Sequence, residues 1–132
     1  MKTLNEKQRE FLSNPFVGIV TTLRADGSPH NTVVWVDTDG GDATFNTEYG
    51  RCKVDNLERD PRVALTVVDP EDPYRWLSVS GTAELIDEGA AAHIDLLAKK
   101  YIDNDVYPWH SAEHARVTVR ITAEKIHDNT VS

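Results

Sequence analysis

Two cations stand close together where a helix is expected to begin, in the stretch Asn46-Thr47-x-x-x-Arg51-x-Lys53. A helix N-terminus presents backbone N–H groups without partners and the positive end of the helix dipole. Cations are unfavourable there, by roughly 0.3–1 kcal/mol each, so their presence indicates an anionic ligand. Arginine can bind a phosphate through two parallel hydrogen bonds. The spacing therefore predicts an anion site, with surface ion pairs to acidic neighbours such as Glu48 as the alternative.

The predicted anion site belongs to an acidic protein. The 132 residues include 14 Lys and Arg against 22 Asp and Glu, for a formal net charge of -8. This balance argues against nucleic-acid binding, which depends on cations that neutralise phosphates. A local cluster of cations can still bind a small anion. Lys99 and Lys100, by contrast, stand near the end of a predicted helix, where the dipole favours cations, so no ligand is needed to explain them and they are expected to matter little for anion binding.

Cellular location is predicted from three features of the chain. The single Cys52 excludes an intrachain disulfide and is typical of a reducing compartment. The N-terminus is charged throughout and lacks the apolar stretch of a signal peptide. No apolar run approaches the roughly 20 residues that span a bilayer. We expect a cytoplasmic protein without a membrane partner.

A second set of candidate site residues is aromatic: Tyr74, Trp76, Tyr107 and Trp109. Trp76 lies on the polar side of an alternating strand, so the pattern does not place it in the core. An exposed tryptophan commonly covers a ligand ring or contacts a partner subunit. The alternative is that Trp76 packs under the loop over residues 103–114.

Motifs for other kinds of site are absent or incomplete. His110 and His114 have i, i+4 spacing, but Glu113 is wrongly placed for the H-E-x-x-H motif, so no metal site is predicted. No G-x-S-x-G motif of an α/β-hydrolase is present, and no G-x-G-x-x-G motif follows a strand.

The hydrophobic pattern predicts a mainly β (α+β) fold formed by one domain over residues 1–132. A first helix begins at the capping residue Asn5 and stops before Pro15. Strands are expected over residues 17–23, 30–36, 43–46, 63–68, 75–85 and 116–126, and further helices over 52–59 and from the cap Asp87 to about 101. The first three strands, joined by short turns, predict an antiparallel meander. Six strands with three short helices indicate a small antiparallel barrel.

Six motifs follow one another along the chain. The central one is "RCKVDNLERDPRVAL"; "TLRADGSPHNTVVW" and "FNT" precede it, and "SVSGTAEL", "KYIDNDVYPWH" and "RVTVRITAEKI" follow it. On these motifs, over about residues 16–126, the chain resembles the pyridoxamine 5'-phosphate oxidase-like split β-barrels. Within that family it is similar to the branch that uses the deazaflavin coenzyme F420. The resemblance implies a six-stranded antiparallel split β-barrel that forms a homodimer, with two cofactor sites in the interface.

The resemblance also implies which residues bind the cofactor. They are Arg51 and Lys53 at its phosphate, Asn46 and Thr47 along the approach, His30, Thr32 and Val34 near the tricyclic ring, and Tyr74 and Trp76 from the partner subunit. No catalytic side chain is identified. His30 is a candidate proton donor, with solvent as the alternative.

The implied activity is that of an F420-dependent oxidoreductase, which transfers a hydride between the deazaflavin and a small organic acceptor. An FMN-binding flavoprotein of the same fold is one alternative. A non-catalytic protein that sequesters a cofactor or a tetrapyrrole is another. The acceptor stays open, because variable loops form the substrate pockets of this fold.

Overall fold

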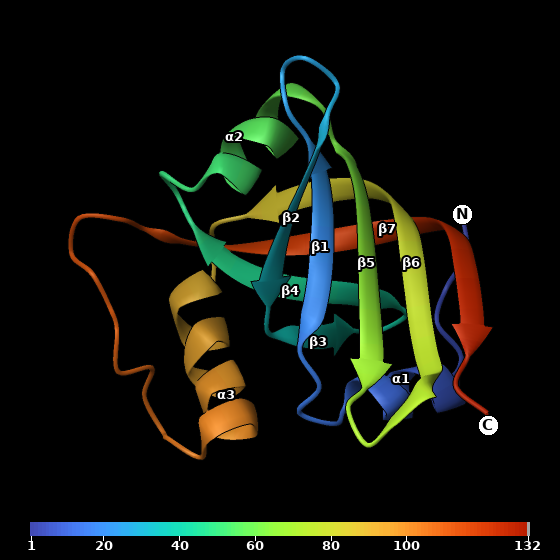
Figure 1. The fold of residues 1–132 in the computed structure, drawn as a ribbon. Coiled ribbons are helices and arrows are strands. Elements are labelled where there is room, and N and C mark those ends of the chain that lie inside the picture. Colours follow the sequence, from blue (N-terminus) through green and yellow to red (C-terminus); the bar gives the residue numbers. More distant parts are fainter. Residues whose placement is uncertain (132) are drawn as a thin grey trace.

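A single antiparallel sheet curls on itself and carries three helices around its rim (Figure 1). The structure, a computed structural model, describes residues 1–131. The elements in chain order are α1 (Glu6–Leu12), β1 (Gly18–Leu23), β2 (Pro29–Val34), β3 (Val36–Asp39), β4 (Asp42–Glu48), α2 (Cys52–Arg59), β5 (Arg62–Asp69), β6 (Asp72–Ile86), α3 (Ala90–Ile102) and β7 (Arg116–Asn129). The strand order is β2-β1-β5-β6-β7-β4-β3. The predicted mainly β fold with three short helices is confirmed.

The core lies inside the curl of the sheet and follows the predicted alternation. Val117, Val119 and Ile121 of β7 are fully buried, and so are Leu77 and Val79 of β6. Each of these strands turns every second side chain inward, because successive side chains of a strand point to opposite faces.

The helix α1 begins as the sequence predicts. The Asn5 side chain accepts a hydrogen bond from the Gln8 N–H, and the Gln8 side chain accepts one from the Asn5 N–H, each at 2.9 Å. This reciprocal capping box satisfies two N–H groups that the helix leaves without partners.

The number and pairing of the strands differ from the prediction. The expected strand over residues 30–36 is two strands, β2 and β3, so the sheet has seven strands rather than six. β2 pairs with β1 antiparallel, as the predicted meander requires, but β4 pairs with β3 and β7 and not with β2, so the second step of the meander is wrong. The cause lies in α3, where the Tyr101 hydroxyl accepts a hydrogen bond from the Val36 N–H at 2.9 Å. The ring of Trp35 stacks on the same tyrosine, with centroids 5.3 Å apart.

The start of α3 also differs from the prediction. The helix begins at Ala90 after Gly89, which has a left-handed backbone conformation with φ of 78°. Asp87 does not cap the helix, because its carboxylate accepts a hydrogen bond from the Tyr49 hydroxyl instead. α3 is the longest helix of residues 1–131, and none of their helices is long and apolar enough to cross a bilayer.

Candidate functional site

A cavity of about 350 Å³ lies at the split in the sheet, between β2 and the end of β4. Its lining residues are Thr32, Val33 and Val34 of β2, Trp35 between β2 and β3, Asn46, Thr47 and Glu48 of β4, Arg51 and Lys53 at the start of α2, Ile94 of α3, Arg116 of β7, and Tyr107 and Trp109 of the loop after α3. β3 pairs with β4 only as far as Phe45. Residues 46–48 therefore have β7 on one side and the cavity on the other.

Three cations meet in this cavity around one carboxylate. Arg51 lies 3.0 Å from Glu48, and Arg116 lies 3.6 Å from the other oxygen of the same carboxylate. Lys53 is 9% exposed and makes no ion pair with any residue from 1 to 131. Burial lowers the pKa of Lys53, and the positive charges of Arg51 and Arg116 lower it further. The cluster therefore carries excess positive charge in a partly desolvated place, where an anion is stabilised.

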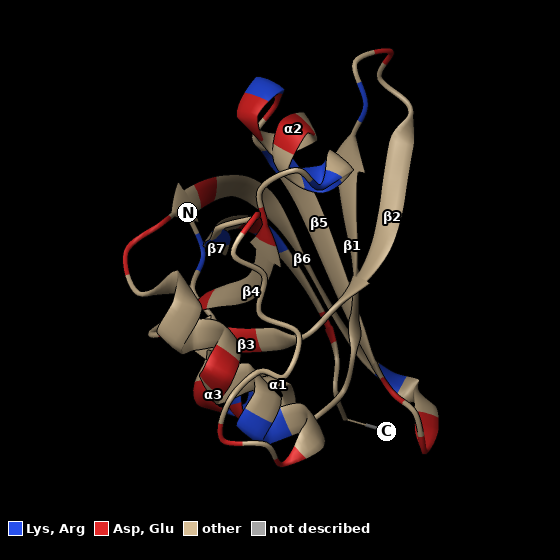
Figure 2. Ribbon diagram, turned by 90° about the vertical axis from the view of Figure 1, so that its left-hand side faces the viewer, with Lys and Arg blue, Asp and Glu red and all other residues tan. Residues whose placement is uncertain are grey.

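The helix α2 places Arg51 and Lys53, and its bounds match the predicted helix over residues 52–59. Arg51 is the N-cap residue, and no side chain caps the helix there. Figure 2, in which α2, α3 and β4 face the viewer, shows basic residues in blue on α2. Arg51 does form the ion pair with Glu48 that the sequence offered as the alternative to an anion site. Lys53 does not, so the surface ion-pair interpretation accounts for only one of the two cations.

Arg116, like Trp35, lines the cavity although the sequence did not predict it as a site residue. Its Nε donates a hydrogen bond to Asn46 Oδ1 at 2.8 Å, and its guanidinium lies 5.1 Å from the centre of the Tyr107 ring. Burial lowers the pKa of Arg116. It stands opposite Glu48 in the pairing of β4 with β7, and this register brings it to the cavity. In the sequence Arg116 is marked only by its place at the start of the motif "RVTVRITAEKI". Its position opposite Glu48 could not be predicted, because the register between two strands far apart in the chain does not follow from local sequence.

An aromatic wall, formed by Trp35, Tyr107 and Trp109, closes another side of the cavity. The ring of Tyr107 meets those of Trp35 and Trp109 edge to face, at 5.9 and 5.5 Å between centroids. Asp95 of α3 holds the loop in place by accepting a hydrogen bond from the Tyr107 N–H at 2.8 Å. Two of the four aromatic residues singled out in the sequence therefore lie at the cavity.

Most of the predicted binding residues come together, and three do not. Thr32, Val34, Asn46, Thr47, Arg51 and Lys53 all line the cavity. His30 lies further along β2 and does not line it. Tyr74 and Trp76 lie on β6, where Trp76 contacts the ring of His127 rather than the loop after α3. Their predicted role requires a second subunit and stays a prediction.

The side chains of the cavity fit a phosphate-bearing cofactor with a planar ring. The Thr32 hydroxyl is buried and has no hydrogen-bond partner among residues 1–131. Buried hydroxyls are nearly always paired, so this one can form a hydrogen bond with a ligand atom. The cations can bind an anionic group such as a phosphate, and the aromatic wall can pack against a planar ring.

The sequence profile of the pyridoxamine 5'-phosphate oxidase family matches residues 4–130. The chain belongs to this family. Among solved structures, an F420 reductase superposes on this pyridoxamine 5'-phosphate oxidase family member with a TM-score of 0.81, at 28% identity over 94% of this chain and 98% of that one. A conserved hypothetical protein of Mycobacterium tuberculosis, Rv2991, superposes with a TM-score of 0.72, at 26% identity over 93% of this chain and 82% of that one.

A curated relative is similar over part of its length. This is an F420H(2)-dependent biliverdin reductase of Mycobacterium tuberculosis (strain CDC 1551 / Oshkosh), which is 37% identical over 82 residues. The match covers 61% of this family member and 58% of the reductase. The split-barrel fold and family that the motifs predicted are confirmed.

Proposed function

We propose that the protein is an F420-dependent oxidoreductase that transfers a hydride between the deazaflavin and a small organic acceptor. The observation that carries the proposal is the group of Arg51, Lys53 and Arg116 around the single carboxylate of Glu48, in a cavity at the split of the barrel. Two relatives named for F420 chemistry support the choice of cofactor.

The protein's own residues would bind and orient the cofactor. Lys53 and Arg116, held at the base of the cavity, would bind its phosphate, and Arg51 would approach from the more exposed rim. Thr32 and Val34 would contact the ring from β2. When bound, reduced F420 supplies a hydride, and fixed cations nearby stabilise negative charge that develops during the reaction. No side chain of the cavity is an evident proton donor, and His30 or solvent would fill that role.

The choice between F420 and FMN is tested by titrating both cofactors in parallel. We expect F420 to bind more tightly, and a purified protein without the yellow colour of a flavin. Tighter binding of FMN would favour a flavoprotein of the same fold. Tight binding of F420 without hydride transfer to a broad panel of acceptors would favour a protein that only sequesters its cofactor.

We also propose that the protein is a homodimer, because the outer face of the sheet is apolar beside the cavity. Ile19 of β1 lies directly opposite Val33 of β2, and Val33 is 61% exposed. Val68 of β5 is exposed and lies opposite Trp76 of β6. Val33 also lines the cavity, so a second copy on this face would close the cavity. The same arrangement would bring Trp76 into the interface, in agreement with the role that the motifs predict for it.

The dimer is expected to persist at micromolar concentration, with an interface larger than roughly 1,000 Å². Val33→Glu should shift the protein towards monomer in sedimentation experiments, because it buries a charge in the interface. Leu96→Glu is the matched control, since Leu96 is similarly exposed but lies on α3. A wild-type monomer at these concentrations, or equal effects of the two variants, would contradict the proposed interface.

A further inference from the structure

The side-chain amide of Asn46 has a fixed orientation in the structure. Its Oδ1 accepts a hydrogen bond from Arg116 Nε at 2.8 Å, and its Nδ2 donates one to the Ala90 carbonyl of α3 at 2.9 Å. Arginine can only donate and a carbonyl can only accept, so the amide cannot be reversed without losing both bonds. Asn46 is buried, and the cavity that it lines contains Arg116.

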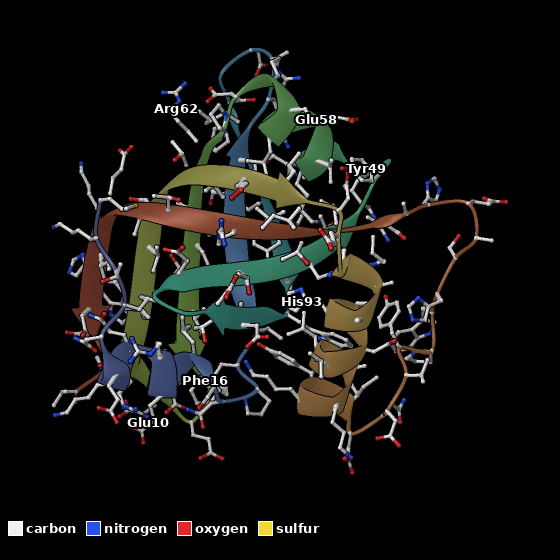
Figure 3. All side chains as sticks on the ribbon, turned by 180° about the vertical axis from the view of Figure 1, so that it is seen from behind. Glu10, Phe16, Tyr49, Glu58, Arg62 and His93 are labelled. Atoms are coloured by element: carbon white, nitrogen blue, oxygen red, sulfur yellow. The ribbon has the colours of Figure 1, made fainter. Side chains whose placement is uncertain are left out.

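The second N–H of the Asn46 amide faces the ring of His93. Its Nδ1 lies 3.2 Å from Asn46 Nδ2 and 3.0 Å from the Thr118 hydroxyl. The remaining acceptor for the amide, the Thr118 hydroxyl, is 3.5 Å away. We assign Nδ1 of His93 as the acceptor because it lies nearer to Asn46 Nδ2 than the Thr118 hydroxyl does, and this assignment places the ring proton on Nε2. Nε2 lies 3.4 Å from Asp37 Oδ2, which accepts it. Figure 3 shows His93 where α3 meets β3 and β4.

These contacts form a continuous chain from outside the cavity to a cation inside it. It runs from Asp37 through His93 and Asn46 to Arg116. His93 itself does not line the cavity. It can therefore influence a bound anion only by acting on the residues between.

We infer that His93 is a positioning residue for the cofactor site: its Nδ1 anchors the Asn46 amide, which in turn holds the Arg116 guanidinium where it meets the anion. The inference rests on the proposed function for the identity of the ligand. Without an acceptor at this position, one buried N–H of Asn46 keeps only its longer contact with the Thr118 hydroxyl, and the amide that orients Arg116 is held less firmly. The guanidinium is then less well pre-organised for a phosphate.

The test compares His93→Leu with His93→Asn by titration with F420 and FMN. His93→Leu removes the acceptor, and we expect binding of F420 to weaken by about three- to tenfold. His93→Asn keeps an oxygen at the position of Nδ1 and should restore most of the affinity. In an Arg116→Ala background, His93→Leu should cause no further loss, because the residue through which it acts is gone. Thermal unfolding of each variant confirms that it is folded.

A second readout needs no cofactor. Hydrogen exchange of the Arg116 Nε–H, followed by NMR in the ligand-free protein, should be faster in His93→Leu than in the wild type and slow again in His93→Asn. Unchanged exchange in His93→Leu, or an equal loss of affinity with and without Arg116, would overturn the positioning role alone. A wild type that binds neither F420 nor FMN would overturn the proposed function alone, and the exchange measurement would still decide the role of His93.

Discussion

Lys53→Ala is expected to weaken the binding of F420 by roughly ten- to a hundredfold, without unfolding the protein. Lys53 has no counterion among residues 1–131, and Arg51 and Arg116 add positive charge beside it. Removing it relieves repulsion in the free protein and takes away a charge-assisted contact in the complex. Both effects lower affinity, and neither costs folding stability. The measurement is titration with F420 and FMN at two salt concentrations.

The matched control for this experiment is Lys99→Ala. Lys99 is a lysine of α3 whose side chain is 58% exposed, and it pairs with Asp103 at 2.8 Å. The Lys99→Ala variant removes one positive charge from the protein, as Lys53→Ala does, but away from the cavity. Equal losses for the two variants would show that general electrostatics attract the cofactor. A loss confined to Lys53→Ala would support a phosphate site at the start of α2.

Lys100→Met is expected to destabilise the fold by about 1–3 kcal/mol. Lys100 Nζ donates hydrogen bonds to the backbone carbonyls of Leu12 and Val36, each at 2.6 Å. These bonds join α3 to the end of α1 and the start of β3. Methionine is of similar length and keeps the apolar stem, so the variant removes the ammonium group with its hydrogen bonds and its contact with the Tyr101 ring. Chemical denaturation measures the loss, with Lys99→Met as the control that should leave stability nearly unchanged.

The contribution of Lys100 should also depend on pH. Burial lowers the pKa of Lys100 from its usual 10.5 to about 8, an effect that the nearby charge of Asp37 partly opposes. Between these two values the unfolded chain holds a proton that the folded chain has lost, so stability rises with pH. The neutral amine still has two protons, enough for both carbonyls. The stability difference between the wild type and Lys100→Met should therefore grow from about pH 7 to about pH 10. A constant or shrinking difference would contradict this.

The helix dipole, which the sequence offered as the explanation of both lysines, does not by itself account for Lys100, whose ammonium donates hydrogen bonds to two backbone carbonyls. Its neighbour Lys99 lies at the surface and pairs with Asp103. The two lysines point in different directions around α3, and only the packing of α3 on the rest of the protein decides which one is buried. Helical spacing alone cannot make that distinction where both residues are of one type.

Features whose causes are local could be predicted from the sequence. The bounds of α2, the capping box at Asn5 and the inward face of β7 follow from side chains within a few residues of one another. The anion site at Arg51 and Lys53 could be predicted for the same reason, because two positive charges at the start of a helix are unusual and are close together in the sequence. The barrel fold could be predicted from the family motifs, because the order of motifs along the chain can be read directly from the sequence.

How distant segments meet became known from the three-dimensional structure. The register of β4 with β7 sets Arg116 opposite Glu48 and so completes the cation cluster. The hydroxyl of Tyr101 takes the Val36 N–H and so divides one predicted strand into two. Packing of α3 against β4 joins His93 to Asn46. Each of these contacts depends on hydrogen bonds between residues far apart in the chain, and their partners are selected by the geometry of the closed sheet rather than by any local pattern.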